Sequence, residues 1–296
     1  MYLTGFADEA GSDIETQIRA IKELGWKNLE ARNVGSKNLT MLDDPEFDAA
    51  CGKLNDAGIR VNSFGSGVAN WAKKFTESPE SSYDEMRRAV PRMQRLGTKF
   101  IRIMSFALPH AIPLADKRSE KEAIARIREI VKIAEGGGVI CLHENCTGWA
   151  GQSWEHTLRL LDAIQSPSLK LVFDTGNPSH ERDIRGAPPH GWQDSLDFYN
   201  HVKEHVVYIH IKDGKHDGDK AVWTFPGEGV GHVEEILRDL FARGYDGGIS
   251  IEPHLAVQAH DPSVTSEAAV RYANYIEYGK RLEDLVRKIG WTPKDR

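Results

Sequence analysis

The sequence predicts a single-domain α/β protein, a (β/α)8 or TIM barrel, and three observations lead to this expectation. Short β-favouring runs alternate with segments of helical periodicity along the 296 residues. These runs are apolar at consecutive positions, as in parallel strands that are covered on both faces. Several runs end in metal-ligand residue types, and a closed barrel brings consecutive strand ends to one central point. A doubly wound open sheet would explain the first two observations but would spread those residues along a line.

Eight strands are expected, with helices between them. The expected strands lie at 3–7, 28–32, 60–64, 100–104, 139–144, 169–174, 206–210 and 248–252. Apolar residues at helical spacing, such as Ile14, Ile18 and Ile21, indicate the intervening helices. Gly25 and Gly58 stand where two of these helices should end.

The whole chain, residues 1–296, is expected to form one domain, because no linker rich in Pro, Gly or Ser divides it. The last helical segment, at about 266–289, is longer than the others and is expected to wrap the outside of the barrel. Residues 178–191 are too polar for the core and should form a long loop over the site after the sixth strand.

Composition limits the partners and the compartment. A formal charge of −6 disfavours nucleic acid and anionic membranes as partners and leaves a small, uncharged ligand as the natural choice. The three cysteines include no Cys-x-x-Cys, so we expect neither a disulfide framework nor a thiolate zinc site. The N-terminus does not read as a signal peptide and no segment is long enough to cross a bilayer, which favours a soluble, cytoplasmic protein.

Metal-ligand types of residue end four consecutive strands. They are Glu144, Asp174, His210 and Glu252. Three carboxylates and one imidazole suit Mn²⁺, Mg²⁺ or Co²⁺, although Zn²⁺ also accepts such ligands. Such an ion can polarise a sugar carbonyl and stabilise the enediolate that forms when a neighbouring C–H proton is removed, and a carboxylate beside it can act as the base.

Side-chain alternation predicts that these four residues point into the barrel. Their neighbours Phe173, Ile209 and Ile251 lie on the opposite face of each strand. Large apolar side chains suit the layer between sheet and helices, which leaves the ligand candidates on the inner face.

At these residues the chain resembles the xylose-isomerase-like TIM-barrel superfamily of sugar isomerases and epimerases. The resemblance is carried by Glu144, Asp174, the His210-Ile211-Lys212-Asp213 segment and Glu252. It implies that Glu144, Asp174, His210 and Glu252 bind one divalent metal, and that Glu144 and Glu252 also exchange protons with the substrate from opposite sides. It also implies a possible homo-oligomer.

One position departs from the epimerase pattern Asp-x-x-His. This chain has Asp174-Thr175-Gly176-Asn177, and an asparagine can hydrogen-bond a sugar hydroxyl but cannot transfer a proton as an imidazole does. The endonuclease IV branch of the superfamily is disfavoured, because it needs more histidines at the strand ends and positive charge for DNA.

Several other polar residues are candidates for substrate binding. They are Glu30, Arg32, Asn62, His143, Asn177, Lys212 and His254. Glu30 and Arg32 could instead form an ion pair at the barrel rim. His143 has the wrong parity to join Glu144 and could lie buried under the helices, and His254 could be a solvated loop residue. Lys212 could stabilise a developing enediolate.

Two further features have plain structural interpretations. The glycine-rich segment 227–231 could be mistaken for a phosphate loop, but Glu228 would repel phosphate, so a helix-entry turn is favoured. The aromatic residues Trp71, Trp149, Trp223 and Phe225 fall in expected loops, where they could stack on a sugar or serve packing alone.

The sequence therefore predicts a metal-dependent isomerase or epimerase that acts on a sugar or cyclic polyol through an enediolate. The same first step serves a dehydratase or lyase that acts on a keto-sugar, a keto-glycoside or an inosose. A non-catalytic sugar-binding protein is the alternative from another class.

Overall fold

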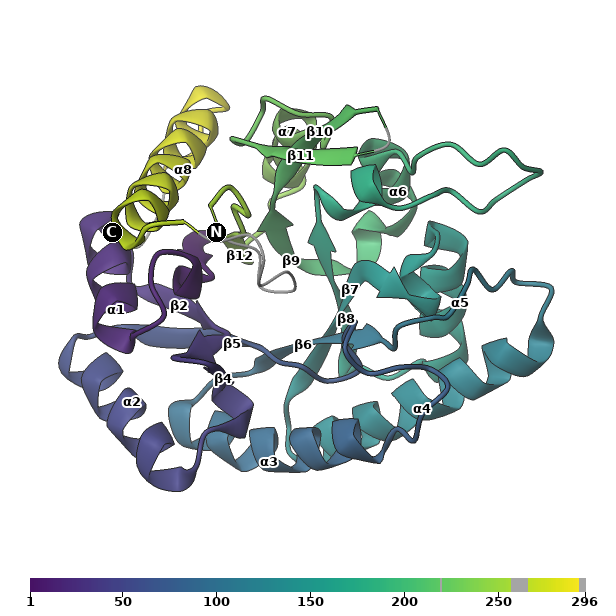
Figure 1. Cartoon of the computed structure of the whole chain (residues 1–296), viewed down its shortest axis with the longest axis horizontal. Coiled ribbons are helices and arrows are strands. Elements are labelled where there is room, and N and C mark those ends of the chain that lie inside the picture. Colours follow the sequence, from purple (N-terminus) through teal and green to yellow (C-terminus); the bar gives the residue numbers. More distant parts are fainter. Residues whose placement is uncertain (219, 257–265, 293–296) are drawn as a thin grey trace.

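Eight parallel strands form a nearly closed barrel surrounded by helices, which confirms the predicted fold (Figure 1). The computed structural model describes residues 1–218, 220–256 and 266–292. The hydrogen-bonded order is β1-β12-β9-β8-β7-β6-β5-β2, and β1 lies against β2 across the seam. The barrel strands are β1 (Tyr2–Gly5), β2 (Asn28–Ala31), β5 (Arg60–Gly65), β6 (Phe100–Ser105), β7 (Ile140–Gly148), β8 (Leu169–Asp174), β9 (Val206–Ile211) and β12 (Gly248–Ile251).

Helices follow the strands around the outside of the barrel (Figure 1). They are α1 (Ile14–Glu23), α2 (Asp44–Asp56), α3 (Glu80–Leu96), α4 (Lys117–Gly136), α5 (Trp154–Ile164), α6 (Ser195–Val202), α7 (Val233–Ala242) and α8 (Ala268–Lys288). Short 3-10 turns complete the list: η1 (Ala7–Glu9), η2 (Leu39–Met41), η3 (Trp149–Gly151), η4 (Asn177–His180) and η5 (Lys203–His205). Helix α8 is the long C-terminal helix that the sequence predicts, and it packs on α1. None of the helices in the described residues is both long and apolar enough to span a membrane.

Local sequence signals fix where several helices begin and end. Asp43 caps α2 by accepting the Glu46 N–H, and the Glu46 side chain accepts the Asp43 N–H in return. Gly97 ends α3 with φ of 70°, a left-handed conformation that glycine adopts without a steric penalty. Gly25 and Gly58, with φ of 73° and 71°, likewise follow α1 and α2, where the sequence predicts that these helices end.

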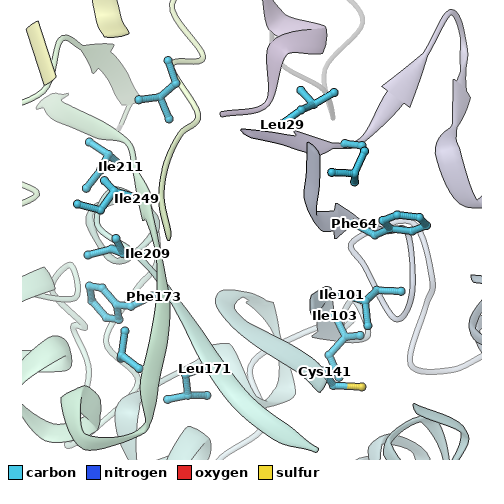
Figure 2. Close-up of a cluster of buried hydrophobic side chains, with 14 of the residues drawn as sticks. Leu29, Phe64, Ile101, Ile103, Cys141, Leu171, Phe173, Ile209, Ile211 and Ile249 are labelled. Atoms are coloured by element: carbon cyan, nitrogen blue, oxygen red, sulfur yellow. The ribbon is translucent and has the colours of Figure 1, made fainter. Parts of the chain in front are cut away.

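The side-chain parity predicted for the strands is confirmed. Phe173, Ile209 and Ile251 belong to the large apolar layer between the barrel and the helices. Figure 2 shows side chains of this layer, among them Phe173 and Ile209, pointing away from the barrel interior. A separate small cluster of Leu142, Val172 and Tyr208 fills the inside. The next inward-facing positions, two residues further along these strands, are occupied by Glu144, Asp174 and His210.

Two short antiparallel hairpins escape the sequence prediction. One pairs β3 (Asn33–Val34) with β4 (Lys37–Asn38), and the other pairs β10 (Asp213–Asp217) with β11 (Lys220–Thr224). Trp223, expected in a loop, therefore lies in a strand. β3, β4 and β10 are short and mostly polar, so they lack the apolar runs that reveal the barrel strands. β11 has the short run Ala221-Val222-Trp223, but it is mostly exposed and lies outside the barrel.

The segment 178–191 is only partly the cover that the sequence suggests. Its first residues continue the 3-10 turn η4, and only His180 and Glu181 of this segment line the central cavity. The remainder runs outward beside α6 (Figure 1). The segment 178–191 is therefore polar because much of it is exposed on the rim of the barrel, as well as because part of it lies near the site.

Truncating Phe173 tests the outer apolar layer. Its ring is buried against Phe198 and Tyr199, at centroid distances of 5.9 and 5.5 Å. Phe173→Ala should lower the free energy of unfolding by about 3–5 kcal/mol in urea titrations, because it leaves a cavity. Val222→Ala, at an exposed position of β11, should change it by less than about 0.5 kcal/mol. Equal effects of the two substitutions would contradict the assignment of Phe173 to the packed layer.

Candidate metal centre and active site

The four predicted ligands converge at one end of the barrel interior. Glu144, Asp174, His210 and Glu252 are all buried, and each offers a ligand atom within 4.8 Å of the others. His210 Nδ1 lies 3.1 Å from Glu144 Oε1 and 4.0 Å from Asp174 Oδ2. Residues from β7, β8 and β9, with one just beyond β12, thus form a single cluster.

Glu30 holds the far side of the His210 ring. The distance between His210 Nε2 and Glu30 Oε2 is 3.1 Å, and Ser63 donates to the other Glu30 oxygen at 3.0 Å. A carboxylate at Nε2 favours a proton on that nitrogen, which leaves Nδ1 facing the other carboxylates as a ligand atom. Glu30 therefore lies behind the histidine, and it does not form the rim ion pair with Arg32.

Asp174 is oriented by its own backbone surroundings. Asn145 bonds the Asp174 main chain on both sides, accepting its N–H at 2.6 Å and donating to its carbonyl at 2.9 Å. The N–H groups of Gly176 and Asn177 donate to Oδ1 at 2.8 and 2.7 Å. Oδ2 is left to face the cluster, where Lys212 Nζ lies 3.2 Å away.

Glu252 is the most heavily ion-paired member of the cluster. Arg32 donates to Oε1 at 2.6 Å, and Lys212 donates to Oε2 at 2.9 Å. Arg32 also contacts Asp8 and Glu9 at 2.9 and 3.0 Å. Both oxygens of Glu252 therefore face cations.

These contacts set the charge of the two candidate catalytic carboxylates. Burial alone would raise the pKa of Glu144, but Arg102 and His210 outweigh it and lower the pKa to about 2. Burial is likewise outweighed at Glu252, where Lys212 and Arg32 hold the pKa well below its usual range. Both side chains are carboxylates at neutral pH and can accept a proton.

His210 and Asp174 shift in the other direction. Burial would lower the pKa of His210, yet the adjoining Glu30 and Glu144 raise it to about 10. Burial raises the pKa of Asp174, partly opposed by Lys212. In the absence of another cation, His210 therefore carries a proton.

The donor set fits a divalent cation. Asp174 Oδ2 and Glu144 Oε2 are buried and make no hydrogen bond within the described residues, although Lys212 and Arg102 lie near them at 3.2 and 3.5 Å. Buried carboxylate oxygens without such partners are costly unless a cation satisfies them. Three carboxylates and one imidazole nitrogen suit hard or borderline divalent ions.

The cluster opens into a cavity of about 620 Å³. Of the predicted substrate-binding residues, Arg32, Asn177, Lys212 and His254 line this cavity together with Glu144 and Glu252. His254 is buried and its Nδ1 lies 2.9 Å from Glu9 Oε1, so it is not a solvated loop histidine. Asn177 Nδ2 donates to Glu144 Oε1 at 3.3 Å.

Three predicted substrate-binding residues are not among those that line the cavity. Glu30 lies behind His210. Asn62 accepts from Thr4 at 2.9 Å and donates to the Tyr208 hydroxyl at 2.6 Å, within the barrel. His143 is fully buried with neither ring nitrogen hydrogen-bonded in the described residues, and burial lowers its pKa to about 4, so its ring is neutral.

The four aromatic candidates divide evenly. Trp71 and Trp223 line the cavity. Trp149 is buried against His156 at 5.1 Å, and Phe225 packs against Tyr278. Trp223 lies close to the cluster, with the Lys212 ammonium 5.2 Å from its ring centre.

Sequence reasoning missed three residues at this site. Arg102 approaches Glu144 from β6, and a cation inside the apolar run 100–104 was the signal that could have revealed it. His180 lies 3.8 Å from the Trp223 ring and lines the cavity with Glu181, whose pKa is raised by burial. His180 and Glu181 follow Asp174 closely in the sequence. The polarity of their segment did not indicate which of its side chains would reach the cavity.

Backbone N–H groups of the glycine-rich segment 227–231 donate to a carboxylate of the protein itself. Asp213 Oδ2 accepts the N–H groups of Gly227 and Gly229 at 2.8 and 3.0 Å, and Oδ1 accepts that of Gly231 at 2.9 Å. These donors are therefore not directed at a phosphate. The interpretation as a helix-entry turn agrees with this arrangement.

A family model described as xylose isomerase-like TIM barrel matches residues 18–273. The chain belongs to this family. Inosose dehydratase from Serratia proteamaculans (strain 568) is 29% identical in a match of 161 positions that covers 50% of this chain and 51% of that protein. The chain thus spans about half the length of the curated relative that it matches.

Solved structures share the whole fold at low sequence identity. D-psicose 3-epimerase from Clostridium cellulolyticum H10, solved with D-tagatose, superposes with a TM-score of 0.69 at 14% identity, covering 98% of this chain and 99% of that one. The IOLI protein, solved with a zinc atom, gives a TM-score of 0.71 at 15% identity and coverage of 99% and 100%. Relatives of this architecture thus include sugar epimerases and metal-binding proteins.

Removing the Asp213 carboxylate should destabilise the protein without altering the metal ligands. Asp213→Ala leaves several backbone N–H groups without their acceptor, so the free energy of unfolding should fall by about 2–4 kcal/mol. Urea unfolding followed by circular dichroism measures this. Asp217→Ala, at an exposed position of the same strand, should change it by less than about 0.5 kcal/mol. A loss no larger than that of the control would mean that Asp213 does not organise the glycine-rich turn.

Proposed function

We propose that this protein is a divalent-metal-dependent sugar isomerase or epimerase that removes a proton next to a carbonyl and proceeds through an enediolate. The observation that supports this most is the convergence of Glu144, Asp174, His210 and Glu252 at the inner end of a cavity. Simple sugar binding does not require two ionised carboxylates at a metal centre, whereas carbon acid chemistry requires a base there.

Glu144, Asp174, His210 and Glu252 would hold the ion. When bound, it would supply Lewis-acid polarisation of the substrate carbonyl and offset the negative charge of the enediolate. The protein's own groups then bind, orient and transfer protons.

Glu144 is the better proton acceptor of the two catalytic carboxylates. Its Oε2 makes no hydrogen bond within the described part of the chain, and its nearest cation is Arg102 at 3.5 Å. Both oxygens of Glu252, in contrast, are held by Arg32 and Lys212. In the proposed reaction the substrate C–H proton moves to Glu144.

The return proton comes from the other side. Lys212 Nζ donates to Glu252 Oε2 at 2.9 Å, so the pair can pass a proton to the enediolate. Afterwards the pair recovers a proton from solvent, and Glu144 releases to solvent the proton that it took from carbon. Delivery to the opposite face of the same carbon inverts it. Delivery to the neighbouring carbon of the enediolate gives the isomer.

Elimination of water is the second candidate. The similarity to inosose dehydratase favours it, and so does Asn177, which places an amide instead of an imidazole beside Glu144. In this variant the proton from the Lys212–Glu252 pair goes to the departing hydroxyl oxygen and not to carbon.

Solvent deuterium exchange tests the shared first step. The Mn²⁺-loaded protein in D₂O should incorporate deuterium next to the carbonyl of at least one member of a panel of ketoses, keto-glycosides and inososes, followed by NMR. Glu144→Gln should lower the exchange rate by about 10²–10⁴-fold, because it removes the base. Glu228→Gln, which alters an exposed glutamate, is the matched control and should leave the rate unchanged.

The products separate the candidates. An epimer or isomer supports the first candidate, and an unsaturated or dehydrated product supports the second. Absence of exchange across the panel, with stoichiometric metal bound, would contradict both and favour a sugar-binding protein.

Metal uptake should release a proton. The pKa of His210 is raised to about 10 in the metal-free protein, and a metal ion binds the neutral imidazole. The affinity for the metal should therefore increase as the pH is raised towards 10 and decrease as the pH is lowered. Calorimetry with Mn²⁺ at pH 8 in two buffers of different ionisation enthalpy should report about one proton released per ion. Glu30→Gln should reduce this release, because it removes the largest charge that raises the pKa. Binding with no proton release would contradict His210 as a ligand.

A further inference from the structure

The cavity is larger than one sugar ring requires. A six-carbon sugar has about a dozen non-hydrogen atoms, and at roughly the 30 Å³ that one water takes in the liquid these fill less than about 360 Å³. The cavity measures about 620 Å³. Because about 360 Å³ is an upper figure for one ring, at least about 260 Å³ remains for a further group when one ring lies at the metal centre.

The outer part of this cavity is built from neutral hydrogen-bonding groups and one indole. Trp71, in the segment between β5 and α3, is 39% exposed and lines the cavity. Asn70 lines it from the same segment, and Ser36 and Asn38 line it from the β3–β4 hairpin. Aromatic faces combined with amides and hydroxyls are the groups that recognise a neutral sugar ring.

The hairpin wall is fixed in place by contacts to the barrel. Asn38 Nδ2 donates to the Gly65 carbonyl at 2.8 Å, and Asn33 Nδ2 donates to Asp8 Oδ2 at 2.8 Å. The Gly35 N–H donates to the Ser12 carbonyl at 2.7 Å. The outer wall is therefore preformed, which reduces the entropy lost when a ligand binds.

The lysine and arginine side chains that line this cavity form ion pairs with carboxylates at its inner end. Arg32 contacts three carboxylates, Arg102 faces Glu144, and Lys212 bridges Asp174 and Glu252. No lysine or arginine is found among the cavity-lining residues of the outer part within the described residues. A phosphate there would find no charged partner, so the outer group is neutral.

We propose that the substrate is a neutral glycoside of two rings, with the reacting keto-sugar at the metal centre and the second ring stacked on Trp71. This deepens the proposed function and rests on it. The second ring supplies binding energy remote from the reacting carbon, and Trp71 acts as a specificity-determining residue.

The test compares two substrates that carry the same reacting ring, a methyl keto-glucoside and a keto-disaccharide oxidised in that ring. Deuterium exchange should show kcat/KM about tenfold higher for the disaccharide. Trp71→Ala should lower the disaccharide value about tenfold and change the methyl glycoside value less than twofold. Trp71→Phe should keep most of the preference, since it retains a stacking face. Phe241→Ala, at an exposed aromatic on α7 outside the cavity, is the control and should change neither.

Binding separates failure of this inference from failure of the proposed function. Calorimetry with the corresponding unoxidised disaccharide needs no turnover, and Trp71→Ala should weaken its binding about tenfold. Equal binding by wild type and Trp71→Ala, or equal loss of both substrates' kcat/KM, would overturn the two-ring assignment. Disaccharide binding that depends on Trp71 in a protein without any exchange would instead overturn the proposed chemistry and leave the subsite intact.

Discussion

The balance of buried charge at one end of the barrel is the constraint on which the rest of the site depends. Carboxylates gather there from several strand ends, and burial on its own would protonate them. Arg32, Arg102 and Lys212 oppose this, each by contacting at least one carboxylate directly. Because an ion pair away from water is stable only when its geometry is good, these contacts also tie the strands that carry them to one another.

The barrel architecture makes this arrangement possible. Parallel strands that end at the same edge place residues distant in sequence side by side, and alternation along each strand separates the apolar layer from the interior. Phe173 and Ile209 therefore pack under the helices while Asp174 and His210, one residue further along, face inward. Leu142, Val172 and Tyr208 fill the space below and close the interior beneath the polar cluster.

The fold and the convergence of the four candidate ligands were predictable because they follow from local patterns. Consecutive apolar residues mark covered strands, and parity assigns Glu144 and Asp174 to the inside without reference to any other element. The side chains that contact these four residues were harder to predict from the sequence. Glu30 and His210 are far apart in the chain, and only the closure of the barrel brings β2 near β9, with β1 and β12 between them, so their hydrogen bond carries no sequence signal. The hairpin strands β3, β4 and β10 were not predicted for a different reason, since they lack the apolar pattern of a covered strand.

Asn177 bears on the reaction type of the proposed function. Its amide donates to Glu144 and has no ionisable proton to give, so in the proposed reaction it would orient the base without sharing in proton transfer. Proton return then falls to the side of the cavity where Lys212 contacts Glu252. In the proposed reaction, the position of the substrate carbon or hydroxyl relative to that pair would decide between inversion, isomerisation and loss of water. The walls of the cavity would set that position, so the same residues would control specificity and reaction outcome.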